Sequence, residues 1–168
     1  GYKFERWNVI KEGENVVVPY GTTWSYYDSG SLDGKNWIQA SYNTATWKNG
    51  RAPLGYGKND IVTTLDYGTN TQNKRPTAYM RQIFNLTKLN SNEKFKLYLT
   101  IDDGAIIYLN GKEVGRHLMS SENVTYNTFA TTYAPGNPDR VTFDLPASAF
   151  QQGSNLLAVE IHQNAGNS

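Results

Sequence analysis

Short runs in which apolar and polar residues alternate constrain the fold of this chain more than any other feature. From Phe95 to Ile101 every second side chain is apolar, and the same period of two recurs over residues 141–145 and 157–161. This is the period of a half-buried β-strand, because successive side chains of a strand point to opposite faces. No window of a dozen residues carries the apolar stripe of a long helix. The sequence therefore predicts an all-β fold.

Turn signals separate these runs at short intervals. The pair Asn110-Gly111 lies between residues 105–109 and 112–115 and predicts a hairpin, because both residues tolerate the positive φ angles of a type I′ turn. Residues 42–47 and 146–150 are the nearest helix candidates, each one or two turns long. Many short strands joined by turns predict a β-sandwich or jelly roll.

A chain of 168 residues without an internal repeat or long linker is expected to form one domain, over residues 1–168. Residues 2–10 alternate like a strand. Residues 1–12 are therefore expected to form an N-terminal extension that pairs at a sheet edge, which would otherwise expose unpaired backbone groups. The alternative is that the last strand of the fold lies outside this chain.

Several segments carry a resemblance to a known fold family. Residues 99–115, with Asp102-Asp103-Gly104 at a turn, and residues 153–160 resemble galactose-binding-like jelly rolls. These include the sugar-binding domain of family 2 glycoside hydrolases and many carbohydrate-binding modules. A closer similarity, to an accessory domain of secreted, multi-domain bacterial proteins, covers residues 24–28, Trp37, residues 47–50 and residues 52–57.

This resemblance implies a jelly-roll β-sandwich that acts as a non-catalytic, carbohydrate-directed module of an exported protein. A polysaccharide or glycan and the adjacent domains of a larger chain are the implied partners. The implied location is extracellular, at the cell surface or periplasmic, and a monomer is expected. The alternative is a structural or interaction module without a ligand, which supports a neighbouring catalytic domain.

Few residues could support catalysis. The chain has no Cys and only two His, and neither His lies in a metal-ligand pair or a catalytic motif. Asp102 and Asp103, adjacent on an extended chain, would point to opposite sides, whereas a glycosidase needs two carboxylates across one sugar bond. His162 is expected to be a solvated or hydrogen-bonded strand residue. We therefore expect no enzyme activity and no cofactor.

Calcium is the one metal ion whose binding the sequence does not exclude. Residues 28–34 do not place oxygen-bearing side chains where an EF-hand needs them. A structural calcium of the kind that jelly rolls bind would need acids from distant segments. The available acids are Asp28, Asp33, Asp102 and Glu160.

The charge balance disfavours nucleic acid and anionic membranes as partners. Sixteen Lys and Arg residues face 15 Asp and Glu residues, which leaves a net charge of +1. Binding to a phosphate backbone or to anionic lipid requires a concentrated positive surface. In addition, no stretch approaches the roughly 20 apolar residues that cross a bilayer.

A sugar site needs aromatic faces for stacking and planar polar groups that bond paired hydroxyls. Trp24, Trp37 and Trp47 are expected to plug the ends of the sandwich, and Tyr56 to pack over a turn, which leaves few rings for a ligand. The candidate ligand-binding residues lie in or near loops. They are Tyr67, Tyr133, Asp66, Asn73, Arg75 and Arg116.

Overall fold

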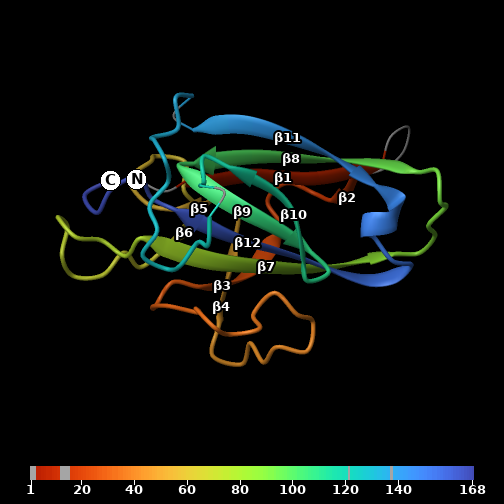
Figure 1. The fold of residues 1–168 in the computed structure, drawn as a ribbon, viewed down its shortest axis with the longest axis horizontal. Helices are drawn as coiled ribbons and strands as arrows, with labels where there is room; N and C mark the ends of the chain where they lie inside the picture. The colour runs from red at the N-terminus through yellow and green to blue at the C-terminus, as the bar shows by residue number, and fades with distance from the viewer. Residues whose placement is uncertain (1–2, 12–15, 121, 137) are drawn as a thin grey trace.

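The computed structural model describes residues 3–11, 16–120, 122–136 and 138–168, and it is a sandwich of two six-stranded sheets (Figure 1). The first sheet contains β1 (Lys3–Lys11), β2 (Val16–Val18), β5 (Leu54–Gly55), β6 (Thr63–Thr64), β8 (Lys94–Asp102) and β11 (Asp139–Pro146). The second contains β3 (Thr23–Tyr27), β4 (Lys48–Arg51), β7 (Thr77–Leu86), β9 (Gly104–Leu109), β10 (Lys112–His117) and β12 (Gly153–His162). This confirms the predicted all-β, galactose-binding-like jelly roll.

The strand β1 lies inside the first sheet, whose order is β11-β8-β1-β5-β6 with β2 also paired to β1. It pairs with β8 from Lys3 opposite Asp102 to Lys11 opposite Phe95. Its other side pairs with β5 and β2. The N-terminal segment therefore pairs with a sheet as expected, but it lies inside the sheet and not at its edge, because both sides of β1 find partners. Residues 1, 2 and 12 of that segment lie outside the described residues.

The core between the sheets is formed by the apolar sides of the alternating strands. The predicted alternation of β8 and β12 is confirmed. Their inward residues are at most 2% exposed, and they are Phe95, Leu97, Leu99, Ile101, Leu157, Val159 and Ile161. Burying each such side chain contributes about 1.5–3 kcal/mol.

The two short segments predicted as helix candidates differ in the structure. Residues 147–149 form one turn of 3-10 helix, η1 (Ala147–Ala149), whereas residues 42–47 form bends and turns.

Two tryptophans cover part of the outer face of the second sheet. Trp24 is fully buried in the sandwich core, but Trp37 and Trp47 pack outside the sheet against Tyr79 of β7 and Ala158 of β12. The prediction that all three plug the ends of the sandwich is therefore wrong for these two. The physical reason is the long β3–β4 connection, which folds back under the second sheet (Figure 1).

The predicted hairpin joins β9 to β10. Asn110 and Gly111 adopt φ angles of 51° and 79°, as a type I′ turn requires. The side-chain nitrogen of Asn110 donates to Oδ1 of Asn155 at 2.9 Å, and its side-chain oxygen accepts the main-chain N–H of Leu156. Asn155 also accepts from the N–H of Gln151 and donates to its carbonyl. One buried amide therefore closes the turn before β12 and links it to the hairpin.

Replacing Asn155 by Ala is expected to lower the free energy of unfolding by about 3 kcal/mol, because it leaves several buried polar groups without partners. Denaturant unfolding measures this change. The control is Asn85→Ala at an exposed position of β7, which should stay within about 0.5 kcal/mol of the unchanged protein. Equal effects of the two variants would contradict this role of Asn155.

Within the described ranges, no helix has the length and apolar character needed to cross a membrane.

Candidate functional site

An open groove of about 370 Å³ lies between two loops of the sandwich. One wall comes from the β6–β7 loop and the other from the β10–β11 loop. Both loops and the C-terminal residues lie at the same end of the sandwich (Figure 1). The lining residues are Asn73, Lys74, Arg75, Pro76, Tyr126, Asn127 and Phe129.

Gln163, directly after β12, joins the two walls. Its side-chain nitrogen donates to the carbonyl of Arg75 at 2.7 Å, and its main-chain N–H donates to the carbonyl of Pro76 at 3.0 Å. Its own carbonyl accepts the N–H of Ala130 at 2.8 Å. Gln163 is fully buried. The walls are therefore held together before any ligand arrives, which reduces the cost of ordering them on binding.

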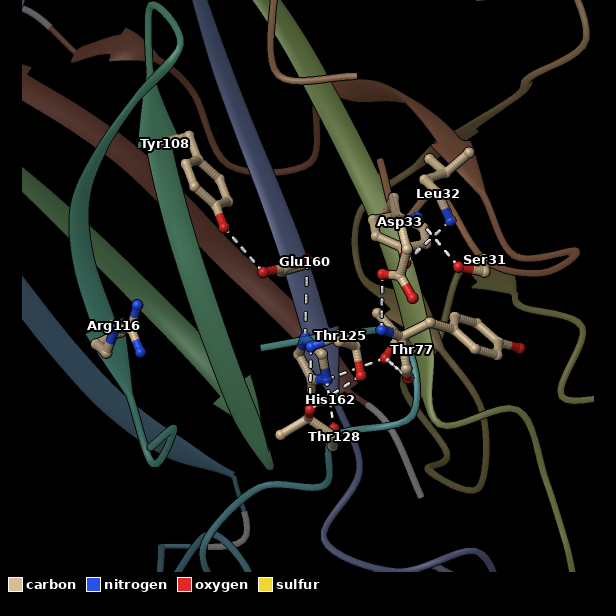
Figure 2. A network of polar contacts seen from close by, with 12 residues as sticks. Ser31, Leu32, Asp33, Thr77, Tyr108, Arg116, Thr125, Thr128, Glu160 and His162 are labelled. Atoms are coloured by element: carbon tan, nitrogen blue, oxygen red, sulfur yellow. Dashed lines mark hydrogen bonds and ion pairs between the residues drawn. The ribbon is translucent and has the colours of Figure 1, made fainter. Parts of the chain in front are cut away.

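His162 and Thr77 form hydrogen bonds with the loop that forms the second wall (Figure 2). Nδ1 of His162 lies 2.7 Å from the carbonyl of Thr128 and 3.0 Å from Oγ1 of Thr77. Because a carbonyl only accepts, Nδ1 of His162 carries a hydrogen. The hydroxyl of Thr77 donates to the carbonyl of Tyr126 at 2.6 Å. His162 is thus a buried, hydrogen-bonded strand residue that fixes the loop carrying Tyr126 and Phe129.

The other edge of the His162 ring faces a buried acid. Nε2 of His162 lies 3.9 Å from one carboxylate oxygen of Glu160, and the hydroxyl of Tyr108 donates to the other at 2.9 Å (Figure 2). Burial, together with the Glu160 carboxylate, raises the pKa of Tyr108 above its ordinary value. The phenol therefore stays protonated and keeps donating to Glu160 across the physiological pH range.

A third contact ties the groove to the loop under the second sheet. The N–H of Tyr126 donates to Oδ1 of Asp33 at 2.9 Å. Burial raises the pKa of the Tyr126 hydroxyl, while the nearby Arg75 acts in the opposite direction. A neutral phenol and a guanidinium therefore lie close together at the groove.

The structure pairs two of the predicted ligand-binding residues with each other. Nη1 of Arg75 lies 2.5 Å from a carboxylate oxygen of Asp66 and donates to the Asp66 carbonyl. The N–H of Gly68 donates to the same carboxylate, and these two donors lower the pKa of Asp66. Arg75 lines the groove with Asn73, whereas Asp66 holds Arg75 from outside it.

The remaining predicted residues do not line this groove. Tyr67 is half-buried, and its ring centroid lies 4.9 Å from that of the buried Tyr56. Tyr133 is 64% exposed. Arg116 on β10 donates from Nε and Nη2 to the two carboxylate oxygens of Glu113, at 2.7 and 2.8 Å. The sequence predicts all three as ligand contacts, and their contact with a ligand stays a prediction.

Five lining residues were not predicted from the sequence. Lys74 and Pro76 flank the predicted Arg75, whereas Tyr126, Asn127 and Phe129 occupy one polar loop without a recognisable motif. The only local signal is an aromatic pair spaced among Thr and Asn residues. Phe129 is 41% exposed, which makes it the most accessible aromatic face of the groove.

Asp103 anchors the turn between β8 and β9, as the structural interpretation of this turn predicts. Its carboxylate accepts the main-chain N–H of Ala134 at 2.9 Å and that of Asn164 at 3.0 Å. Asp102 lies beside it and is also buried, 3.3 Å from the ammonium of Lys58. A side-chain hydrogen bond joins the two carboxyl groups. The prediction that they point to opposite sides is therefore wrong, because β8 ends at Asp102 and the extended backbone does not continue to Asp103.

The four acids considered for calcium have separate protein partners. Asp28 forms an ion pair with Lys48 at 2.8 Å, and Asp102 lies beside Lys58. Asp33 accepts from the N–H of Tyr126, and Glu160 accepts from the hydroxyl of Tyr108. Among the described residues, no three side chains of His, Asp or Glu are grouped as a metal ion would need.

Comparison with known proteins shows the fold alone. No protein-family model matches the sequence, and no curated protein matches it. The chain is similar in structure to a β-glucuronidase from glycoside hydrolase family 2, with a TM-score of 0.56 and 19% sequence identity. The similarity covers 94% of this chain and 14% of that one. This chain thus corresponds in fold to one segment of a much longer protein.

The unfolding free energy is expected to fall as pH rises between about 4 and 6 because of Asp102. Burial and the neighbouring Asp103 raise the pKa of Asp102 from 3.8 to about 6. In this range the folded chain binds more protons than the unfolded chain. The stabilisation is complete below pH 4 and is lost above pH 6, with a slope of up to about 1.4 kcal/mol per pH unit.

Urea unfolding at several pH values measures this effect, and Asp102→Asn should remove it because the amide does not titrate. The control is Asp144→Asn, which changes an exposed acid that pairs with Lys96 on the surface. If Asp102→Asn keeps the pH dependence of the unchanged chain, the assignment to Asp102 is wrong.

Proposed function

We propose that this chain is a non-catalytic carbohydrate-binding module and that its ligand lies in the groove between the β6–β7 and β10–β11 loops. The observation that carries the proposal is the exposed ring of Phe129 beside the side chains of Asn73, Asn127 and Arg75. An aromatic face packs on the C–H surface of a sugar ring, while amides and a guanidinium bond its hydroxyls. The groove supplies both at one place.

The composition of the groove also supports binding without hydrolysis. Its described lining contains amide, cationic and aromatic side chains but no carboxylate. Hydrolysis of a glycosidic bond requires an acid and a second carboxylate flanking the sugar. The buried pair Asp102 and Asp103 is instead committed to main-chain N–H groups and to Lys58.

The proposed setting is an exported, multi-domain protein that acts outside the cell, at its surface or in the periplasm. It rests on the sequence resemblance and on the fold shared with one segment of a longer glycoside hydrolase. A shallow, open groove of this kind gives weak affinity for a single site. Attachment to neighbouring domains would offset this weakness by raising the effective concentration of the module near its polysaccharide.

A structural module without a ligand is the second candidate. The observation in its favour is that the similar β-glucuronidase holds this fold as 14% of its length, so the sandwich could support a neighbouring domain. This candidate predicts that no groove residue affects retention by any glycan.

Native gel electrophoresis with and without a panel of soluble polysaccharides tests the proposal. We expect at least one polysaccharide to retard the chain, and Phe129→Ala to weaken that binding about tenfold by removing roughly 1.4 kcal/mol of apolar contact. Calorimetry with the retained polysaccharide measures the change.

Tyr133→Ala is the matched control, since it removes another exposed ring from the same β10–β11 loop without touching the groove lining. It should change the affinity less than twofold. Loss of binding in Tyr133→Ala but not in Phe129→Ala would move the site away from the groove. A folded chain that no polysaccharide retards would favour the structural module.

A further inference from the structure

A buried cation, to which no described residue gives an anionic partner, lies on the outer face of the second sheet. Arg81 of β7 is 4% exposed. Its guanidinium donates to the carbonyls of Gln39 and Tyr42, at 2.9 and 3.3 Å. Its Nε has no hydrogen-bond partner, and no carboxylate among the described residues forms an ion pair with it. The guanidinium therefore keeps unused N–H donors and an uncompensated charge.

Two aromatic rings hold this guanidinium in place. Its central carbon lies 5.9 Å from the ring centroid of Tyr42 and 5.8 Å from that of Trp47. These contacts stabilise a cation and fix its plane. They do not neutralise it, and burying a charge without an opposite charge is unfavourable. Arg81 is thus a fixed, buried cation whose charge no described residue neutralises.

An open groove of about 210 Å³ leads to Arg81. Its lining includes the hydroxyl-bearing residues Thr23, Ser25 and Thr44, with the exposed Ala40 at its rim. Among the described residues, no Asp or Glu lines it. The groove shares no lining residue with the one assigned to carbohydrate above.

We propose that this second groove binds the carboxylate of an acidic sugar, with Arg81 as the cationic partner. A guanidinium provides parallel N–H donors that match the two oxygens of a carboxylate. The hydroxyls of Ser25 and the two threonines match the hydroxyls of a sugar ring, and the size of the groove fits one ring. This site does not depend on the function proposed for the first groove.

The direct test is an amide NMR titration of the whole chain with D-glucuronate and, separately, with D-glucose. The two sugars differ mainly in the carboxylate. Glucuronate should shift the amide signals of Ser25, Thr44 and Arg81 and the Nε–H signal of Arg81, with an affinity at least tenfold higher than that of glucose. Equal binding of both sugars at these signals, or no shift with either, would overturn the proposal.

Two charge changes at the rim test the site without disturbing Arg81. Ala40→Glu should weaken glucuronate binding at least threefold, and Ala40→Lys should tighten it by a similar factor. Ala45→Glu is the control, because Ala45 is exposed in the same β3–β4 connection but does not line the groove. Identical affinities for Ala40→Glu and Ala40→Lys would contradict a carboxylate site here.

Arg81→Gln should abolish the preference for glucuronate over glucose. If that variant unfolds because its loop contacts are lost, the Ala40 variants still decide the question. Phe129→Ala should leave glucuronate binding unchanged, so failure of this site and failure of the first groove can be told apart. The affinities of monomeric galacturonate and of its tetramer distinguish the source of the carboxylate. Tighter binding of the tetramer indicates a polysaccharide, and equal binding of both indicates a free sugar acid.

Discussion

The pairing of β7 with β12 is the constraint on which the rest of the structure depends. These strands pair over ten positions, from Gly153 opposite Leu86 to His162 opposite Thr77. Their inner side chains build the sandwich core, and their outer side chains build a second, partly polar layer. At the end of the ladder, Thr77, His162 and Gln163 bond to the loops that form the groove. A central strand pair thus sets the positions of loops that have no regular structure of their own.

Covering the outer face of the second sheet has a functional consequence. An outward-facing row of Tyr79, Arg81 and Glu160 would lie in water if the sheet were bare. Instead, the β3–β4 connection and the β10–β11 loop bury it, so its polar groups interact in a low-dielectric setting where hydrogen bonds are stronger and unpaired groups cost more. Most of them find partners within the chain. Arg81 has no anionic partner among the described residues, which is why a ligand is inferred there.

Local features of the fold were predictable from the sequence, whereas contacts between distant segments were not. The alternation around Leu97 and the positive φ of Asn110 depend only on neighbouring residues, and both are confirmed. The position of Trp37 depends on how a long loop folds back over a sheet, which no local pattern encodes. The candidate groove could be predicted only in part for the same reason: Asn73 and Arg75 were identified on one loop, but Phe129 comes from another loop far along the chain.

Hydrogen bonds hold the groove walls in place before a ligand binds, and native-state hydrogen exchange tests this rigidity most directly. The amides of Tyr126 and Ala130 lie in a loop without regular secondary structure, yet they donate to Asp33 and Gln163. We predict that both amides exchange about a hundredfold or more slower than unstructured amides in the ligand-free chain. Exchange of both amides at the rate of an unstructured peptide would contradict it.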